Sequence, residues 1–253
     1  ADRFENKGKR SGAYHSGSYD SPPYMLLNYQ RENLSDVFTL AHEAGHAMHS
    51  YYSNKHQPYQ DHSYTIFVAE VASTFNEQLL MGELRKRYSD QPEVMTYLIN
   101  HQIDDIKGTF FRQVMFAEFE LELHSRAEAN KPTTLDAMRS IYRRLLEKYF
   151  GPAVSFSAVD ELECLRIPHF YSAFYVYKYA TGLAAAMSLS DQVVSQGAAA
   201  QQRYLQFLKS GASKRPLELL RDAGVDLTEP RSMQVLTGKF SELVSELESK
   251  LGK

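Results

Sequence analysis

The sequence is poor in cysteine. Cys164 is the only cysteine among 253 residues, which excludes an intramolecular disulfide and a cysteine-rich zinc framework. It lies in the mainly apolar stretch 162–165, so we interpret it as a buried, unreactive thiol rather than a nucleophile. The lack of disulfides favours a reducing compartment, and we expect a cytoplasmic protein.

Basic clusters and long apolar runs are also missing. No basic block or stripe appears and the formal net charge is −3, which argues against nucleic acid and a charged membrane surface as partners. The first ten residues lack the apolar core of a signal peptide. The most apolar stretch, 170–189, is interrupted by Lys178 and several hydroxyl groups, so it falls short of a membrane span.

What the sequence contains is typical of a globular domain with a substantial core: 43% apolar and 23% charged residues. Apolar residues recur at helical spacing, and Ser35 is the expected N-cap of a first helix of about four turns. Further helices are expected over 64–88, 92–129, from Thr133 or Thr134 to 150, and over 170–194, 199–209, 215–223 and 232–251. One strand is expected at Tyr24–Tyr29, and no linker divides the chain, so we predict a single, mainly α domain.

The first predicted helix contains the pattern His42-Glu43-Ala44-Gly45-His46. Residues four apart lie one turn above each other, so His42 and His46 can direct two imidazoles to one metal ion. Glu43 is rotated by about 100° from His42 and can act as general base toward a water on the metal. Such a pattern also arises by chance on exposed helices. The apolar flanks favour a buried metal site here, because burial of these side chains needs a compensating partner.

Catalytic zinc normally has three protein ligands and an open position. His49 lies on the same stripe, but it is two turns from His42, so we interpret it as a packing or supporting residue. Glu70 stands in an apolar run of the second helix, where a buried carboxylate requires a cation, and is the preferred third ligand. Glu77, on nearly the same face, is the alternative, or it orients a ligating histidine.

Four blocks of the chain resemble oligoendopeptidase F, in the thimet oligopeptidase and neurolysin group of zinc peptidases. The blocks are Ser11-Gly12-Ala13-Tyr14 with 23–29, Thr39–His49, Phe67–Ser73, and 167–171 with 177–182. The resemblance implies a mainly helical, zincin-type catalytic domain of neurolysin-like fold with a minor β element. It also implies one Zn²⁺ per chain, held by His42, His46 and Glu70, in a channel that admits short peptides. Family members have a large N-terminal helical region that is absent here, so we expect residues 1–253 to be the catalytic part alone.

The resemblance further implies residues that contact the substrate. His169 and Tyr177, with Tyr171 as a third, correspond to a family cluster that binds substrate and stabilises the oxyanion. From the residues alone, these tyrosines equally fit an aromatic helix in a core. We also hypothesise that the strand with Tyr24 and Leu26 pairs its free edge with the substrate backbone, the alternative being an ordinary core strand.

Together these features predict a zinc endopeptidase for short peptides, with Glu43 as general base. Two alternatives stay open at this point. The chain is a zinc-binding fragment without activity of its own, or it is a helical scaffold that binds no stoichiometric zinc.

Overall fold

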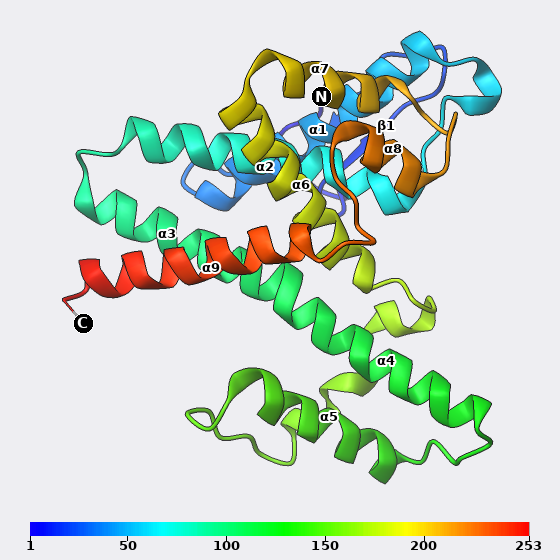
Figure 1. Cartoon of the computed structure of the whole chain (residues 1–253), viewed down its shortest axis with the longest axis vertical. Helices are drawn as coiled ribbons and strands as arrows, with labels where there is room; N and C mark the ends of the chain where they lie inside the picture. Colours follow the sequence, from blue (N-terminus) through cyan, green and yellow to red (C-terminus); the bar gives the residue numbers. More distant parts are fainter. Residues whose placement is uncertain (253) are drawn as a thin grey trace. The chain divides into compact units, whose positions relative to one another are not determined.

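The computed structural model describes residues 1–252. They form two compact units: unit 1 comprises 1–103 and the described part of 182–253, and unit 2 comprises 104–181. Within the described residues there are nine α-helices and one two-stranded sheet (Figure 1). This confirms the predicted mainly α class with a minor β element. That the chain is one catalytic domain stays a prediction.

Unit 1 contains the sheet and most of the helices. The elements are β1 (Tyr14–Ser16), β2 (Tyr24–Leu26), α1 (Leu34–His56), α2 (Ile66–Arg87), α3 (Pro92–Ile106), α6 (Tyr177–Gln196), α7 (Ala198–Lys209), α8 (Pro216–Ala223) and α9 (Arg231–Lys250). The end of α3 and the start of α6 belong to unit 2. The N-cap of α1 is Asn33 and not Ser35, because the Asn33 side chain accepts the Ser35 N–H at 3.1 Å. α1 is also longer than predicted, at 23 residues.

Helices α1 and α2 approach each other closely at Gly45. A Cβ added there would lie 2.5 Å from the Ala72 carbonyl oxygen and 2.6 Å from the Ser73 Cα, so only glycine fits. α2 also shares an apolar core with α6, α7 and α8, which includes the fully buried Val71 and Leu208. Each such side chain stabilises the packing by roughly 2 kcal/mol. This core fixes the helix that carries Glu70.

The small sheet has one open edge, and it belongs to β1. The two strands are antiparallel with His15 opposite Met25. On the other side of β2, the Asp2 N–H donates to the Met25 carbonyl at 2.9 Å, so β2 is paired on both edges. The hypothesis of a free edge at Tyr24–Tyr29 is therefore wrong, and the strand is shorter than expected. Since backbone groups alternate between edges, His15 directs its N–H and C=O to the open edge of β1.

Unit 2 is built around α4 (Arg112–Glu128) and α5 (Leu135–Phe150), which lie side by side in Figure 1. A π-helical segment, η2 (Lys107–Phe111), joins α3 to α4, so helical backbone runs over the predicted length. Of the two candidate caps, Thr134 is the N-cap of α5. Short 3₁₀ segments follow at Asp160–Leu165 and Pro168–Tyr171. Cys164 is buried in this unit's core, which confirms that part of its interpretation.

The aromatic helix predicted over 170–194 begins only at Tyr177. Phe174 has φ of +53°, which is outside the right-handed helical region. Its N–H donates to the buried carboxylate of Glu120, on α4, at 2.6 Å. A contact 54 residues away in sequence thus replaces the helical hydrogen bond that the local pattern predicts.

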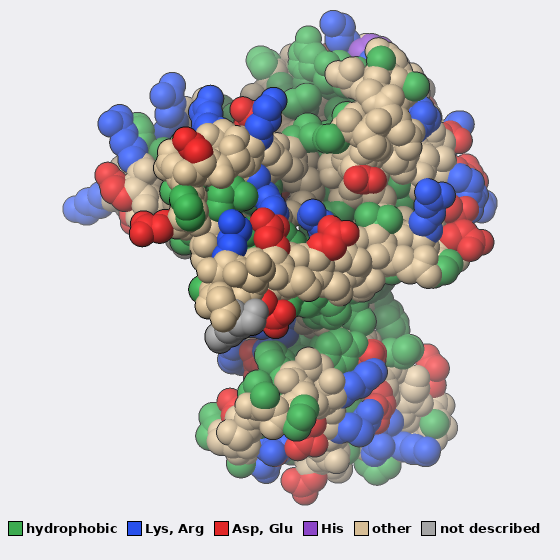
Figure 2. Space-filling model, turned by 60° about the vertical axis from the view of Figure 1, so that its left-hand side comes forward, with side chains coloured by type: hydrophobic (Ala, Val, Ile, Leu, Met, Phe, Trp, Pro, Cys, Tyr) green, Lys and Arg blue, Asp and Glu red, His purple; other side chains and the backbone are tan. Residues whose placement is uncertain are grey.

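The surface agrees with the composition. Basic and acidic side chains are interspersed over the face in Figure 2, as expected from the near-balanced charge. Among the described helices, none combines the length and the apolar character needed to cross a membrane.

Candidate metal centre

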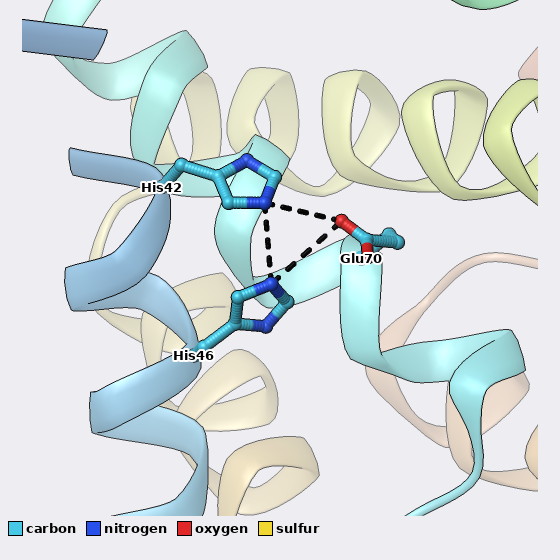
Figure 3. A group of neighbouring side chains, drawn as sticks. All are labelled: His42, His46 and Glu70. Carbon is cyan, nitrogen blue, oxygen red and sulfur yellow. Dashed lines mark hydrogen bonds and ion pairs between the residues drawn. The ribbon is translucent and has the colours of Figure 1, made fainter. Parts of the chain in front are cut away.

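Two imidazoles from α1 and one carboxylate from α2 converge on one point (Figure 3). The Nε2 atoms of His42 and His46 are 3.2 Å apart, and Glu70 Oε2 lies 3.3 Å and 3.7 Å from them, respectively. Ligand atoms placed about 2.0–2.1 Å from a tetrahedral zinc ion are about 3.3–3.4 Å apart. The spacing of the three atoms therefore fits zinc to within a few tenths of an ångström.

His42 is oriented by Glu77. Its Nδ1 lies 2.5 Å from Glu77 Oε1, so Nδ1 carries a proton that is donated to Glu77, and Nε2 faces the other ligand atoms. Burial lowers the pKa of His42, but hydrogen bonds and charges from Glu70 and Glu77 outweigh it and raise the pKa to about 10. Two carboxylates thus create a strong attraction for a cation at this imidazole. Glu77 thus lies at the Nδ1 of His42, and Glu70 is the carboxylate of the three-residue group.

His46 and Glu70 have supporting partners of their own. The ring of His46 hydrogen-bonds to the Ala69 backbone, and burial lowers its pKa to about 4 although Glu70 raises it. The Ser73 hydroxyl donates to Glu70 Oε2 at 3.1 Å. Burial raises the pKa of Glu70, but the hydrogen bond from His42 and the nearby charges lower it overall. At neutral pH His46 is neutral and Glu70 ionised, which are the forms that bind metal.

Glu43 is buried next to this cluster. One of its oxygens, Oε2, is inaccessible and has no hydrogen-bond partner among the described residues. The His15 backbone N–H donates to its carboxylate. Burial raises the pKa of Glu43, partly opposed by the charge of His42. A carboxylate with a raised pKa and an unpaired oxygen beside a candidate metal site is suited to proton transfer.

His49 lies in the core. Its ring stacks on Tyr64 with centroids 3.7 Å apart, and it is 1% exposed. Burial lowers the pKa of His49 to about 3, so the ring is neutral at neutral pH. It is not part of the three-residue group. The placement agrees with its interpretation as a packing residue.

His15 is the neighbour of the site that the sequence did not reveal. Its ring centroid lies 6.2 Å from that of His46, and its backbone reaches Glu43. Nothing in the local pattern separates it from other polar residues of the N-terminal loop. Only the pairing of β1 with β2 places it beside α1.

The remaining predicted site residues are not members of the three-residue group on α1 and α2. Tyr24 and Leu26 form the ends of β2. In unit 2, the His169 Nε2 lies 3.3 Å from the Tyr179 hydroxyl, and its ring contacts that of Tyr175.

Tyr171 is 89% exposed and Tyr177 is 37% exposed. Both belong to unit 2, as does His169. The predicted substrate roles of these residues stay predictions, whereas pairing of a substrate with the strand of Tyr24 and Leu26 is wrong because Asp2 pairs with that edge.

A helical scaffold that presents two histidines and a glutamate to one point is the design of a metallohydrolase centre. Comparison with known proteins agrees with this class. The model of Peptidase family M3 matches residues 1–237, and the chain belongs to that family.

Among curated relatives, the chain is 50% identical to an oligoendopeptidase F homolog of Borreliella burgdorferi, over 92% of this chain and 39% of the relative. It is 46% identical to oligopeptidase PepF of Bacillus subtilis, over 100% of this chain and 37% of that protein. The chain thus spans about two-fifths of the length of these relatives. The resemblance to oligoendopeptidase F inferred from the sequence blocks is confirmed.

Solved structures show the same fold. A crystal structure of oligoendopeptidase F from Enterococcus faecium matches with a TM-score of 0.77 and 39% identity, over 87% of this chain and 40% of that one. A Chlamydophila abortus protein matches with a TM-score of 0.87 and 44% identity, over 98% and 41%. The expected fold family is thereby confirmed.

Proposed function

We propose that this chain is a zinc endopeptidase that hydrolyses short peptides. The observation that carries the proposal is the triangle of His42 Nε2, His46 Nε2 and Glu70 Oε2, whose edges of 3.2–3.7 Å fit one tetrahedral zinc. Two histidines and one glutamate leave a coordination position for water or substrate, as catalytic zinc requires. Membership of a peptidase family supplies the reaction class.

His42, His46 and Glu70 would hold the Zn²⁺, which when bound polarises a carbonyl and lowers the pKa of water. Glu43 accepts the proton of the attacking water on its carboxylate and passes it to the leaving amine. The His15 N–H keeps the Glu43 carboxylate in position. Glu77 and Ser73 fix the orientations of His42 and Glu70.

Substrate binding is proposed on two surfaces. The open edge of β1 offers the His15 carbonyl to an extended peptide, which would bind by main-chain hydrogen bonds with little dependence on sequence. The proposed pairing edge is therefore that of β1 and not that of β2. Tyr24 and Leu26 of β2 pair with Ser16 and Tyr14 on the other edge of β1. His169 and Tyr177, with Tyr171, are proposed to bind substrate and donate hydrogen bonds to the oxyanion.

Replacing Glu43 by glutamine tests the proposal. Glu43→Gln removes the proton acceptor and leaves the three zinc ligands in place, so we expect one zinc per chain and a loss of cleavage of a short fluorogenic peptide by about 100-fold or more. Glu32→Gln, at an exposed position just before α1, is the matched control and should cleave at the wild-type rate. Undiminished cleavage by Glu43→Gln would disprove the role of Glu43.

A second candidate function is zinc binding without peptidase activity in this chain alone. The observation in its favour is that the chain spans about two-fifths of the length of its relatives. Metal analysis beside the cleavage assay separates the two functions. Stoichiometric zinc with no cleavage by the wild-type chain would favour the second.

A further inference from the structure

A small cavity of about 200 Å³ lies beside the metal cluster in unit 1. We call it the polar pocket, and the residues that matter for its chemistry are His15, Ser18, Ser50, Asn54, Ser63 and Tyr64. Two of its lining residues, His15 and Tyr64, contact His46 of the candidate metal centre. The His15 ring lies 6.2 Å from that of His46, and the Tyr64 hydroxyl donates to the His46 carbonyl at 3.4 Å.

The lining of the polar pocket is polar but carries no fixed charge. Of its ten residues only Gly17 and Pro23 lack a polar side chain, and none is Asp, Glu, Lys or Arg. A charged side chain would lose its hydration there without gaining a counter-ion, which is unfavourable. An aliphatic side chain would leave the polar lining without partners.

Hydrogen-bonding capacity in the pocket is left unused. The buried Nε2 of His15 has no partner among the described residues. The Asn54 amide nitrogen donates to the Ser18 carbonyl at 3.1 Å, which leaves the Asn54 side-chain oxygen as an acceptor. Ser50 and Tyr64 bond to each other through their hydroxyls at 2.7 Å. A ligand group that both donates and accepts, as a carboxamide does, matches this combination.

The pocket is also within reach of a peptide on β1. His15 directs its C=O to the open edge of the strand. In a strand that pairs there, the residue opposite His15 has its side chain on the same face, with the two Cβ atoms about 4.5–5.5 Å apart. That side chain is adjacent to the His15 ring and therefore to the polar pocket.

We propose that the polar pocket is a specificity pocket that selects an asparagine or glutamine side chain of the peptide. The proposal rests on the proposed function, since it requires a peptide on the edge of β1. In addition to that function, it specifies a preference for a carboxamide side chain. His15 and Asn54 are the residues that hydrogen-bond to that side chain.

Binding of peptides that cannot be hydrolysed tests the pocket separately from catalysis. The probes are seven-residue peptides with a reduced central bond (CH₂–NH), carrying Gln, Leu, Glu or Lys at each position in turn, measured by titration calorimetry. At one position we expect Gln to bind about 3- to 10-fold more tightly than Leu, with Glu and Lys weakest. Asn54→Leu and His15→Phe should each reduce the preference for Gln. Gln202→Leu, exposed on α7, should retain it.

Three results would overturn the proposal: equal binding of Gln and Leu at every position, an unchanged preference in both variants, or no binding of any probe. Zinc content and circular dichroism of each variant show that the fold is retained. Cleavage of an ordinary peptide is measured in parallel. A preference for Gln without any cleavage would count against the proposed catalysis and leave the pocket supported.

Discussion

The helix pair α1–α2 and the segment Pro168–Tyr179 both carry histidine and other side chains suited to catalysis, but they position them differently. The candidate metal ligands stand on two regular helices that meet at Gly45. His169 lies on a 3₁₀ turn. The chain then passes through Phe174, which has a positive φ and whose N–H donates to the Glu120 carboxylate. Helical spacing determines which side chains share a face, whereas an irregular segment depends on individual distant contacts. The first arrangement is therefore predictable from sequence and the second is not.

The largest expected effect concerns the helix crossing. Gly45→Ala places a Cβ within 2.6 Å of the α2 backbone, so the helices must separate. We expect a loss of about 3 kcal/mol in the free energy of unfolding, together with weaker zinc binding. Gly82→Ala is the matched control in α2, where an added Cβ meets nothing within 4 Å, and should stabilise by about 0.5–1 kcal/mol. Urea unfolding and zinc titration measure both, and equal stability of the two variants would contradict the account of the crossing.

The second prediction tests the orientation of His42. Glu77→Gln removes the charged acceptor of the His42 ring proton. Zinc affinity, measured by competition with a chelating dye, should fall about 10- to 100-fold. Glu83→Gln, exposed on the same helix, should bind zinc as the wild type does. An unchanged affinity in Glu77→Gln would remove Glu77 from the site.

The third prediction tests the irregular segment. Glu120→Ala leaves the Phe174 N–H without its acceptor, at a cost of about 1.5 kcal/mol. Hydrogen exchange of residues 168–176 should accelerate about tenfold, in keeping with that free energy. Glu128→Ala, exposed near the end of α4, is the control and should leave exchange unchanged. If Glu120→Ala also leaves exchange unchanged, the segment is held by other contacts.

The smallest effect concerns His49, the histidine of α1 that lies in the core. Burial lowers its pKa to about 3, below the ordinary value of 6.5. Between these values the unfolded chain binds a proton that the folded chain does not, so stability falls as pH decreases, by at most about 1.4 kcal/mol per pH unit. His49→Phe keeps an aromatic ring and removes the titration. Its stability loss between about pH 6 and pH 5 should be smaller than that of the wild type by about 1 kcal/mol.

Comparing urea unfolding curves at the two pH values checks this prediction. His56→Phe, at an exposed position near the end of α1, is the control and should follow the wild type. A His49→Phe variant with the wild-type pH dependence would show that His49 titrates normally.

Most of the helical content could be predicted because apolar spacing and caps are local signals. The spans of α2, α7, α8 and α9 agree with prediction to within about two residues. The grouping of His42, His46 and Glu70 could be predicted as well. The two histidines are four residues apart on one helix, and a carboxylate in an apolar run, as at Glu70, requires a cation. The start of α6 could not be predicted, because it depends on the distant contact from Glu120.

The position of His15 could not be predicted either. Three-residue strands give almost no periodic signal, and the pairing of both edges of β2 involves Asp2, far from the strand's own sequence. The π-helical segment between α3 and α4 likewise has no local sequence pattern that distinguishes it from an α-helix. Sheet pairing and irregular backbone are set by contacts between distant residues, which one sequence does not display.

The central claim is that His42, His46 and Glu70 bind one zinc ion. Anomalous diffraction at the zinc edge from crystals of this chain grown with zinc tests it most directly. The account predicts one peak per chain, within about 2.0–2.2 Å of His42 Nε2, His46 Nε2 and a Glu70 oxygen. No peak at this position, or a zinc ion bound by Glu77 in place of Glu70, would contradict it.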